Sequence, residues 1–171
     1  MVSETDILST INKLDEKYNS ALLSESPQDA IFYAKLALLE YCGWLEETFD
    51  DIVRASVDGK LKTRVFKDVL EKEIIKRTYG FQYRNHFVPM LMRSIGIVEV
   101  EKLENEMNKN GGLDILIAEL KAVKKTRNDA AHTWIAGTTK TYEAPSVTTG
   151  RLGKVFPVIE SIYGKVTKQV K

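Results

Sequence analysis

Apolar residues recur at intervals of three and four positions along most of this chain, the spacing typical of one face of an α-helix. Segments rich in Gly, Pro, Ser and Asn separate the periodic stretches. Seven stretches have the pattern: residues 4–23, 28–57, 61–78, 87–95, 98–110, 113–134, and a last one from Thr148 or Thr149 to about 169. The pattern predicts an all-α protein, a bundle of about six to seven helices.

The second stretch is the longest predicted helix, and it carries two apolar stripes. The first stripe contains Ile31, Ala34, Leu38, Cys42, Leu45, Phe49 and Ile52. The second contains Tyr33, Ala37, Tyr41 and Trp44, with Glu40 and Glu47 among them. A helix with apolar residues on two sides is expected to be covered on both by other helices.

The sixth stretch carries an arginine on its apolar face. At about 100° per residue, this face contains Leu116, Leu120, Val123, Ala130 and Trp134. Arg127 falls in the middle of them, which is costly unless the guanidinium is paired or lies at the rim of a cavity. Asn128 and His132 lie one turn apart on a different face, where the amide could orient the imidazole.

Arg127 and His132 are five positions apart, which places them about 140° apart around an ideal helix. One copy of the helix therefore aims the two side chains poorly at a common target. Two copies that face each other across a dimer axis could share one cleft, so we expect a homodimer.

Composition and charge narrow the possible classes of function. The 171 residues suggest one domain, residues 1–171, and a hydrophobic content of 43% is ordinary for a globular protein. A formal charge of +1 gives no global attraction to nucleic acid, so RNA binding would depend on a local patch. Cys42 is the single cysteine, which excludes a disulfide framework and a cysteine-based zinc site.

Targeting and cofactor signals are not expected. The N-terminus lacks the apolar core of a signal peptide, and no apolar run approaches the length that spans a membrane. We therefore expect a cytoplasmic protein with no membrane segment. Gly111 and Gly112 have neither a preceding strand nor a following Gly-Lys-Ser/Thr, which excludes a phosphate loop, and no cofactor or metal is expected.

Residues 127–132 read Arg-Asn-Asp-Ala-Ala-His and resemble the signature of the HEPN superfamily. That signature is an arginine, a polar residue, and a histidine after four to six intervening positions. Its setting also fits, because the motif ends a late amphipathic helix that is followed by a loop and one last helix. The resemblance implies an HEPN-like domain, usually dimeric, and in many members a metal-independent RNase of toxin or antiviral-defence systems.

The resemblance assigns catalysis to Arg127 and His132, with Asn128 beside them. RNA carries its own nucleophile, the 2′-hydroxyl. An enzyme that cleaves it therefore needs a base for the proton of that hydroxyl, an acid for the leaving 5′-oxygen, and a positively charged group that stabilises the phosphorane. Histidine, with a pKa of about 6.5, is suited to proton transfer, and arginine binds phosphate bidentately. Two-fold symmetry would supply two of each without a metal, and Lys121, Lys124 and Lys125 would bind the RNA backbone.

Acidic residues near the motif are candidates for support. Glu40 or Glu47 could pair with Arg127 and hold its guanidinium, or could simply reach solvent at the edge of their stripe. Asp129 lies within the motif as a third supporting acid. One position departs from the HEPN toxins paired with nucleotidyltransferase antitoxins: where these often have a nucleotide-accepting tyrosine, this chain has Trp134.

His86, the other histidine, lies in an aromatic connector between Asn85 and Phe87. Its predicted role is a structural hydrogen bond at the edge of the core, and the alternative is a second catalytic group acting with the nearby Arg84. Thr-rich residues 137–150 are expected to form a loop that folds over the motif.

Three functional hypotheses follow. The first is an endoribonuclease that cleaves RNA in a composite dimer cleft within a toxin or defence system. The second is a non-catalytic module that binds RNA or nucleotide. The third is a structural helical subunit, whose partner would be an antitoxin or a defence-system protein. The motif would then have no catalytic role, because lysines and a histidine near a helix C-terminus also stabilise a helix through its dipole.

Overall fold

The computed structural model describes residues 2–132 and 142–168, the side chain of His132 excepted. These residues form seven α-helices, two short π-helical segments and no strand, which confirms the prediction of an all-α bundle. The elements are α1 (Thr5–Leu23), α2 (Pro27–Ser56), α3 (Arg64–Val69), η1 (Leu70–Ile75), η2 (Tyr83–Phe87), α4 (Val88–Ile95), α5 (Ile97–Lys109), α6 (Gly112–His132) and α7 (Pro145–Lys168).

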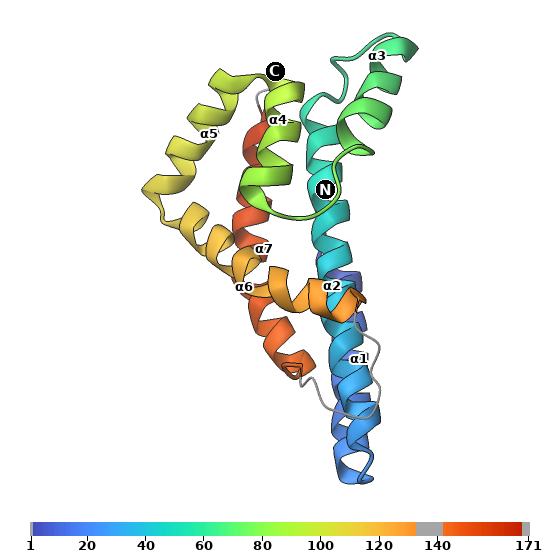
Figure 1. Cartoon of the computed structure of the whole chain (residues 1–171). Coiled ribbons are helices and arrows are strands. Elements are labelled where there is room, and N and C mark those ends of the chain that lie inside the picture. Colours follow the sequence, from blue (N-terminus) through green and yellow to red (C-terminus); the bar gives the residue numbers. More distant parts are fainter. Residues whose placement is uncertain (1, 133–141, 169–171) are drawn as a thin grey trace.

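The long helix α2 is the axis of the molecule, as its two apolar stripes predict. α1 folds back antiparallel against it, and α7 packs against both (Figure 1). Leu45, Phe49 and Ile52 of α2 are fully buried, and Ile11 of α1 and Ile159 of α7 meet them in the core. Burial of such side chains stabilises the fold by roughly 1.5–3 kcal/mol each.

The motif helix α6 runs across α7 and reaches α2 with its C-terminal end (Figure 1). Its apolar stripe is buried as predicted, because Leu116, Leu120, Val123 and Ala130 all lie in the core. Trp134, the last member of the stripe, lies outside the described residues. Packing therefore leaves the polar side of α6 on the surface of the bundle.

The prediction of one helix over residues 61–78 is wrong in its details. The chain forms the short α3 and then widens into the π-helical η1. Val65 and Val69 are exposed, whereas Ile75 is buried. Among the described elements, α3 has its main contact with η1 and projects past the end of α2 (Figure 1), which leaves its apolar residues Val65, Phe66 and Val69 exposed.

The prediction that the last helix starts at Thr148 or Thr149 is also wrong. α7 begins at Pro145, where the missing N–H of proline costs nothing, and Thr148 is buried within the helix. The next N–H, from Ser146, donates to Asp15 Oδ1 of α1 at 3.0 Å. A carboxylate from another helix thus caps α7, which a local sequence pattern cannot reveal. The loop expected over 137–150 is correspondingly shorter, and its residues 137–141 lie outside the described part.

None of the described helices combines the length and the apolarity that crossing a membrane requires. The longest, α2, carries charged residues throughout its 30 residues.

Candidate functional site

Arg127 lies at the rim of the bundle, where α6 meets the middle of α2. Its Nη2 donates to Glu46 Oε1 at 2.9 Å, and its Nη1 donates to Asn128 Oδ1 at 3.3 Å. The side chains of Arg127 and Glu46 are 31% and 30% exposed. Two contacts on a group with five N–H donors leave others for an incoming anion. The guanidinium is therefore oriented by protein groups and still open to solvent.

The acid that holds Arg127 is Glu46, so the alternative in which Glu40 or Glu47 pairs with it is wrong. The other alternative, in which Glu40 and Glu47 reach solvent, is confirmed, because both are exposed. Successive residues of α2 differ by about 100° around the helix axis, and Glu47 consequently lines a different surface pocket, with Trp44. Glu40 is exposed. Glu46 follows the buried Cys42 by one turn, so it lies on the side of α2 that other helices cover. This position beside the apolar stripe was the sequence signal that could have identified Glu46 as the partner of Arg127.

Asn128 contacts Arg127, a partner that was not predicted, and its side-chain oxygen accepts a hydrogen bond from Arg127 Nη1. The expected contact between Asn128 and the His132 side chain lies outside the described residues. Asp129, the other expected supporting residue, is half-buried on the same turn. The backbone of His132 ends α6 one turn after Asn128, and the side chain of His132 lies outside the described residues.

Lys121, Lys124 and Lys125 are exposed cations on the same stretch of α6 that carries Arg127. Around the helix axis Lys124 is the nearest of them to Arg127, about 60° away, whereas Lys121 and Lys125 are about 120° and about 160° away. We call these four residues the α6 ridge. None of the three lysines forms an ion pair with another residue of the described part. No carboxylate of the described part therefore competes with an anion for these three ammonium groups.

The structure brings His86 close to the α6 ridge, a proximity that the sequence did not predict. Burial lowers the pKa of His86, and the positive charges of Lys124 and Arg127 lower that pKa further. At neutral pH the imidazole is therefore uncharged. Its Nδ1 accepts the backbone N–H of Gln82 at 3.1 Å, which confirms the predicted structural hydrogen bond and leaves the proton on Nε2.

Gly80 permits this position of His86. A Cβ at residue 80 would lie 2.4 Å from Cε1 of the imidazole, and the φ of +123° disfavours any other residue. The imidazole of His86 therefore lies against the backbone of Gly80, near Lys124 and Arg127 of α6. A larger residue at position 80 would push the ring away from this place.

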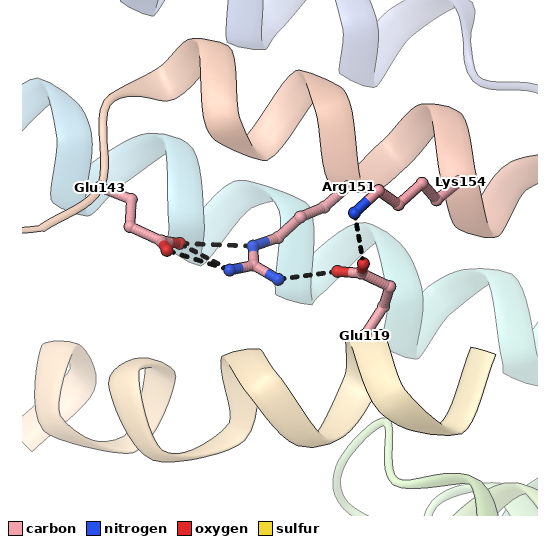
Figure 2. Close-up of polar contacts among 4 residues, drawn as sticks. All are labelled: Glu119, Glu143, Arg151 and Lys154. Carbon is pink, nitrogen blue, oxygen red and sulfur yellow. Dashed lines mark hydrogen bonds and ion pairs between the residues drawn. The ribbon is translucent and has the colours of Figure 1, made fainter. Parts of the chain in front are cut away.

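A second polar cluster fastens α6 to α7 (Figure 2). Arg151 of α7 donates to Glu119 of α6 at 2.7 Å and to Glu143 at 2.9 Å, and Lys154 also reaches Glu119, at 2.8 Å. Arg151 and Glu119 are only 16% and 13% exposed. Burial raises the pKa of Glu119, but hydrogen bonds from Lys154 and Arg151 outweigh it, so the pKa is lowered overall. The cluster sets the position of α6 and was not predicted.

Other chemistry is less well supported by the described residues. Cys42 is buried, and burial raises the pKa of its thiol to about 12, so the reactive thiolate does not form at neutral pH. Within residues 2–132 and 142–168, no three His, Cys, Asp or Glu side chains converge in a way that could hold a metal ion. The α6 ridge is therefore the best-developed candidate site.

The fold and this site define a class: an all-α bundle with an arginine-centred basic surface on the helix before the last. Comparison of the chain with protein-family models, with curated proteins and with solved structures finds no match in any of the three. Residues 127–132 and the surface around them are therefore the basis for assigning a function.

Proposed function

We propose that this protein is a metal-independent endoribonuclease of a toxin or antiviral-defence system, with an HEPN-like domain. The observation that carries the proposal is the state of Arg127. Its guanidinium is oriented by Glu46 and Asn128, remains about one-third exposed, and lies on the same helix as three exposed lysines with no ion-pair partner among the described residues. An arginine in this state can bind a phosphate without prior rearrangement of the fold.

The proposed reaction is transesterification. The 2′-oxygen of a ribose forms a bond to the adjacent phosphorus, and the bond from that phosphorus to the 5′-oxygen of the next nucleotide breaks. A base takes the proton of the 2′-hydroxyl, and an acid gives a proton to the leaving 5′-oxygen. The products are a 2′,3′-cyclic phosphate and a 5′-hydroxyl, and no co-reactant is needed.

Within this reaction, Arg127 stabilises the negative charge that develops on the phosphorane oxygens, for which a planar guanidinium is well suited. His132 transfers protons, which typically contributes about 10²–10⁴-fold to the rate. A second copy of the chain supplies the second histidine, so that one imidazole acts as base and the other as acid. Lys121, Lys124 and Lys125 hold the RNA backbone.

Glu46 has a positioning role in this scheme. A carboxylate beside the guanidinium restricts its orientation, and a misplaced charge in an active site can cost about 10²-fold in rate. Since the pair lies at the rim, the carboxylate does not bury the arginine away from substrate.

The test is incubation of the protein with labelled RNA in EDTA. The parent protein should cleave, and His132→Ala and Arg127→Ala should both be inactive, because each removes one half of the motif. Lys109→Ala, an exposed lysine at the end of α5, is the matched control and should cleave like the parent. Full activity in both motif variants would show that the motif is not the active site.

A second candidate function, RNA binding without cleavage, is favoured by the three lysines of α6, which have no ion-pair partner within residues 2–132 and 142–168 and need no histidine to act. Binding by the parent protein, together with intact RNA after prolonged incubation with and without divalent cations, would favour this function over the RNase.

A further inference from the structure

A small pocket lies beside the α6 ridge, between α6 and η2. Its volume is about 180 Å³. Ile117 of α6 lines it as a partly exposed apolar residue, and the buried Leu120 of α6 and Tyr83 of η2 lie at its base, so its floor is mainly aliphatic. Whole-ligand pockets usually measure about 300–1,000 Å³, so this one fits a single ring system rather than a complete cofactor.

Amide groups line the same pocket. Asn85 Nδ2 donates to Gln82 Oε1 at 3.4 Å, which holds the two side chains together. No other residue of the described part forms a hydrogen bond with the side-chain oxygen of Asn85 or with the side-chain nitrogen of Gln82. One acceptor and one donor are therefore available to a ligand. Paired amide groups of this kind read the hydrogen-bonding edges of nucleobases.

Two cations complete the lining of the pocket. Arg84 lies with its guanidinium over the ring of Tyr83, 5.4 Å from Cζ to the ring centroid, and is held there by Glu104. Lys121 lines the pocket from the α6 side and also begins the α6 ridge. The backbone N–H of Gln82, in the pocket lining, donates to His86 Nδ1, and His86 lies close enough to Lys124 and Arg127 for their charges to lower its pKa. The pocket and Arg127 therefore lie on the same side of the molecule.

We infer that this pocket binds one base of single-stranded RNA and gives the protein a base preference. The inference rests on the proposed function for its substrate class. The base lies on the apolar floor, with its edge against Gln82 and Asn85, while Lys121 and Lys124 contact the adjoining phosphates. Sequence-specific RNA recognition generally uses unpaired bases in this manner, stacked on aromatic rings or guanidinium planes.

His86 links the pocket to the ridge and provides a readout other than cleavage. The backbone N–H of Gln82, which lines the pocket, donates to His86 Nδ1, and the charges of Lys124 and Arg127 lower the pKa of His86. A phosphate that binds these two cations offsets their charge. RNA binding should therefore raise the pKa of His86, whether or not the RNA is cleaved.

The experiment measures binding of fluorescent 2′-O-methyl RNA octamers, which lack the attacking hydroxyl, to the full-length protein. Four homopolymers are compared by fluorescence anisotropy. Ile117→Trp fills the pocket, and the matched control Ile115→Trp places the same ring at an exposed position of the same helix. Asn85→Ala removes one amide from an exposed residue, so it tests the pocket even if Ile117→Trp fails to fold.

The parent should prefer one base by about tenfold or more, the order expected for one bidentate contact. Ile117→Trp and Asn85→Ala should reduce this preference to less than about threefold and leave the salt dependence unchanged, because the lysines still hold the phosphates. Ile115→Trp should behave like the parent. The pKa of His86 should rise on binding in the parent.

Unchanged base preference in both pocket variants, with cleavage by the parent intact, would overturn the pocket and leave the RNase standing. A base preference that depends on the pocket, in a protein that never cleaves RNA, would support the pocket and overturn the RNase. A parent with no base preference would overturn the inference, even if its affinity for RNA were high.

Discussion

At the scale of the residue, the partial exposure of Arg127 decides how it can act. A fully buried ion pair would be costly to break, whereas a pair at the rim contributes typically about 1 kcal/mol or less. Arg127 and Glu46 are each about one-third exposed, so their contact orients the guanidinium more than it stabilises the fold.

Substitution of Arg127 should therefore separate activity from stability. Arg127→Ala should abolish cleavage and change the free energy of unfolding by only about 1 kcal/mol. Arg127→Lys should also cleave poorly, because an ammonium cannot bind phosphate bidentately. Single-turnover cleavage and urea denaturation measure the two effects. A loss of stability near 4 kcal/mol would instead indicate a structural arginine.

Glu46 and Glu47 form a matched pair for testing the positioning role. Glu46→Gln should lower the cleavage rate by at least about tenfold without weakening RNA binding to the same extent, because the guanidinium loses its fixed orientation. Glu47→Gln should have no effect on cleavage, since Glu47 lines another pocket. Equal rates for both variants and the parent would contradict the role given to Glu46.

The environment of His86 makes a prediction that needs no RNA. In Lys124→Ala the pKa of His86 should rise toward its ordinary value, because one of the two nearby positive charges is removed. Lys125→Ala should leave that pKa almost unchanged. NMR titration of the imidazole protons, assigned with His86→Gln, measures the effect, and an identical pKa in Lys124→Ala and the parent would contradict the arrangement.

Asp50 of α2 should make stability depend on pH. Burial raises its pKa to about 6, and the charges of Glu47 and Asp51 act in the same direction. The folded state therefore holds this proton more tightly than the unfolded chain, and the resulting stability is lost as the pH rises through about 6.

Asp50→Asn should consequently be more stable than the parent at about pH 8, and the advantage should shrink as the pH falls toward about 4. Asp51→Asn is the control: Asp51 is exposed and bound to Arg54 at 2.9 Å, so its loss should give no such advantage. Urea denaturation across this pH range measures the difference.

At the scale of the element, the position of α6 depends on its attachment to α7. Arg151 contacts carboxylates on both sides (Figure 2). Its contact with Glu119 is nearly shielded from water, because the two side chains are only 16% and 13% exposed. The lowered pKa of Glu119 means that this carboxylate stabilises the fold above its ordinary pKa and loses that contribution as the pH falls.

Arg151→Ala should cost about 3 kcal/mol of folding free energy, because it leaves the largely buried Glu119 with one exposed partner. Lys154→Ala should cost about 1 kcal/mol or less, since the Lys154 side chain is solvated. Urea denaturation measures both values, and the difference between Arg151→Ala and the parent should decrease at low pH. Equal losses of folding free energy in the two variants would show that Arg151 does not stabilise the fold more than the exposed Lys154 does.

At the scale of the whole molecule, the proposed reaction requires two copies of the chain. Arg127 is held toward α2, whereas His132 follows it by about 140° around α6. A dimer that apposes two α6 helices brings an arginine and a histidine from different copies into one cleft. Light scattering at micromolar concentration should therefore show a homodimer. A monomer with full RNase activity would remove the shared cleft from the mechanism.

The helices themselves could be predicted from the sequence, because their hydrogen bonds and apolar spacing are local. α1, α2, α5 and the buried stripe of α6 lie within one or two residues of the predicted positions. Arg127, Asn128 and the three lysines could likewise be identified as candidates, since their residue types and spacing are visible in the chain.

Only the tertiary structure decided which residues meet. Glu46 rather than Glu47 reaches Arg127 because the crossing of α6 over α2 selects one side of α2, and a rotation of 100° separates neighbouring candidates. His86 approaches Lys124, and Asp15 caps α7, through contacts between segments far apart in sequence. Local periodicity specifies which face of a helix is buried, but the partner on that face depends on how all the helices pack together.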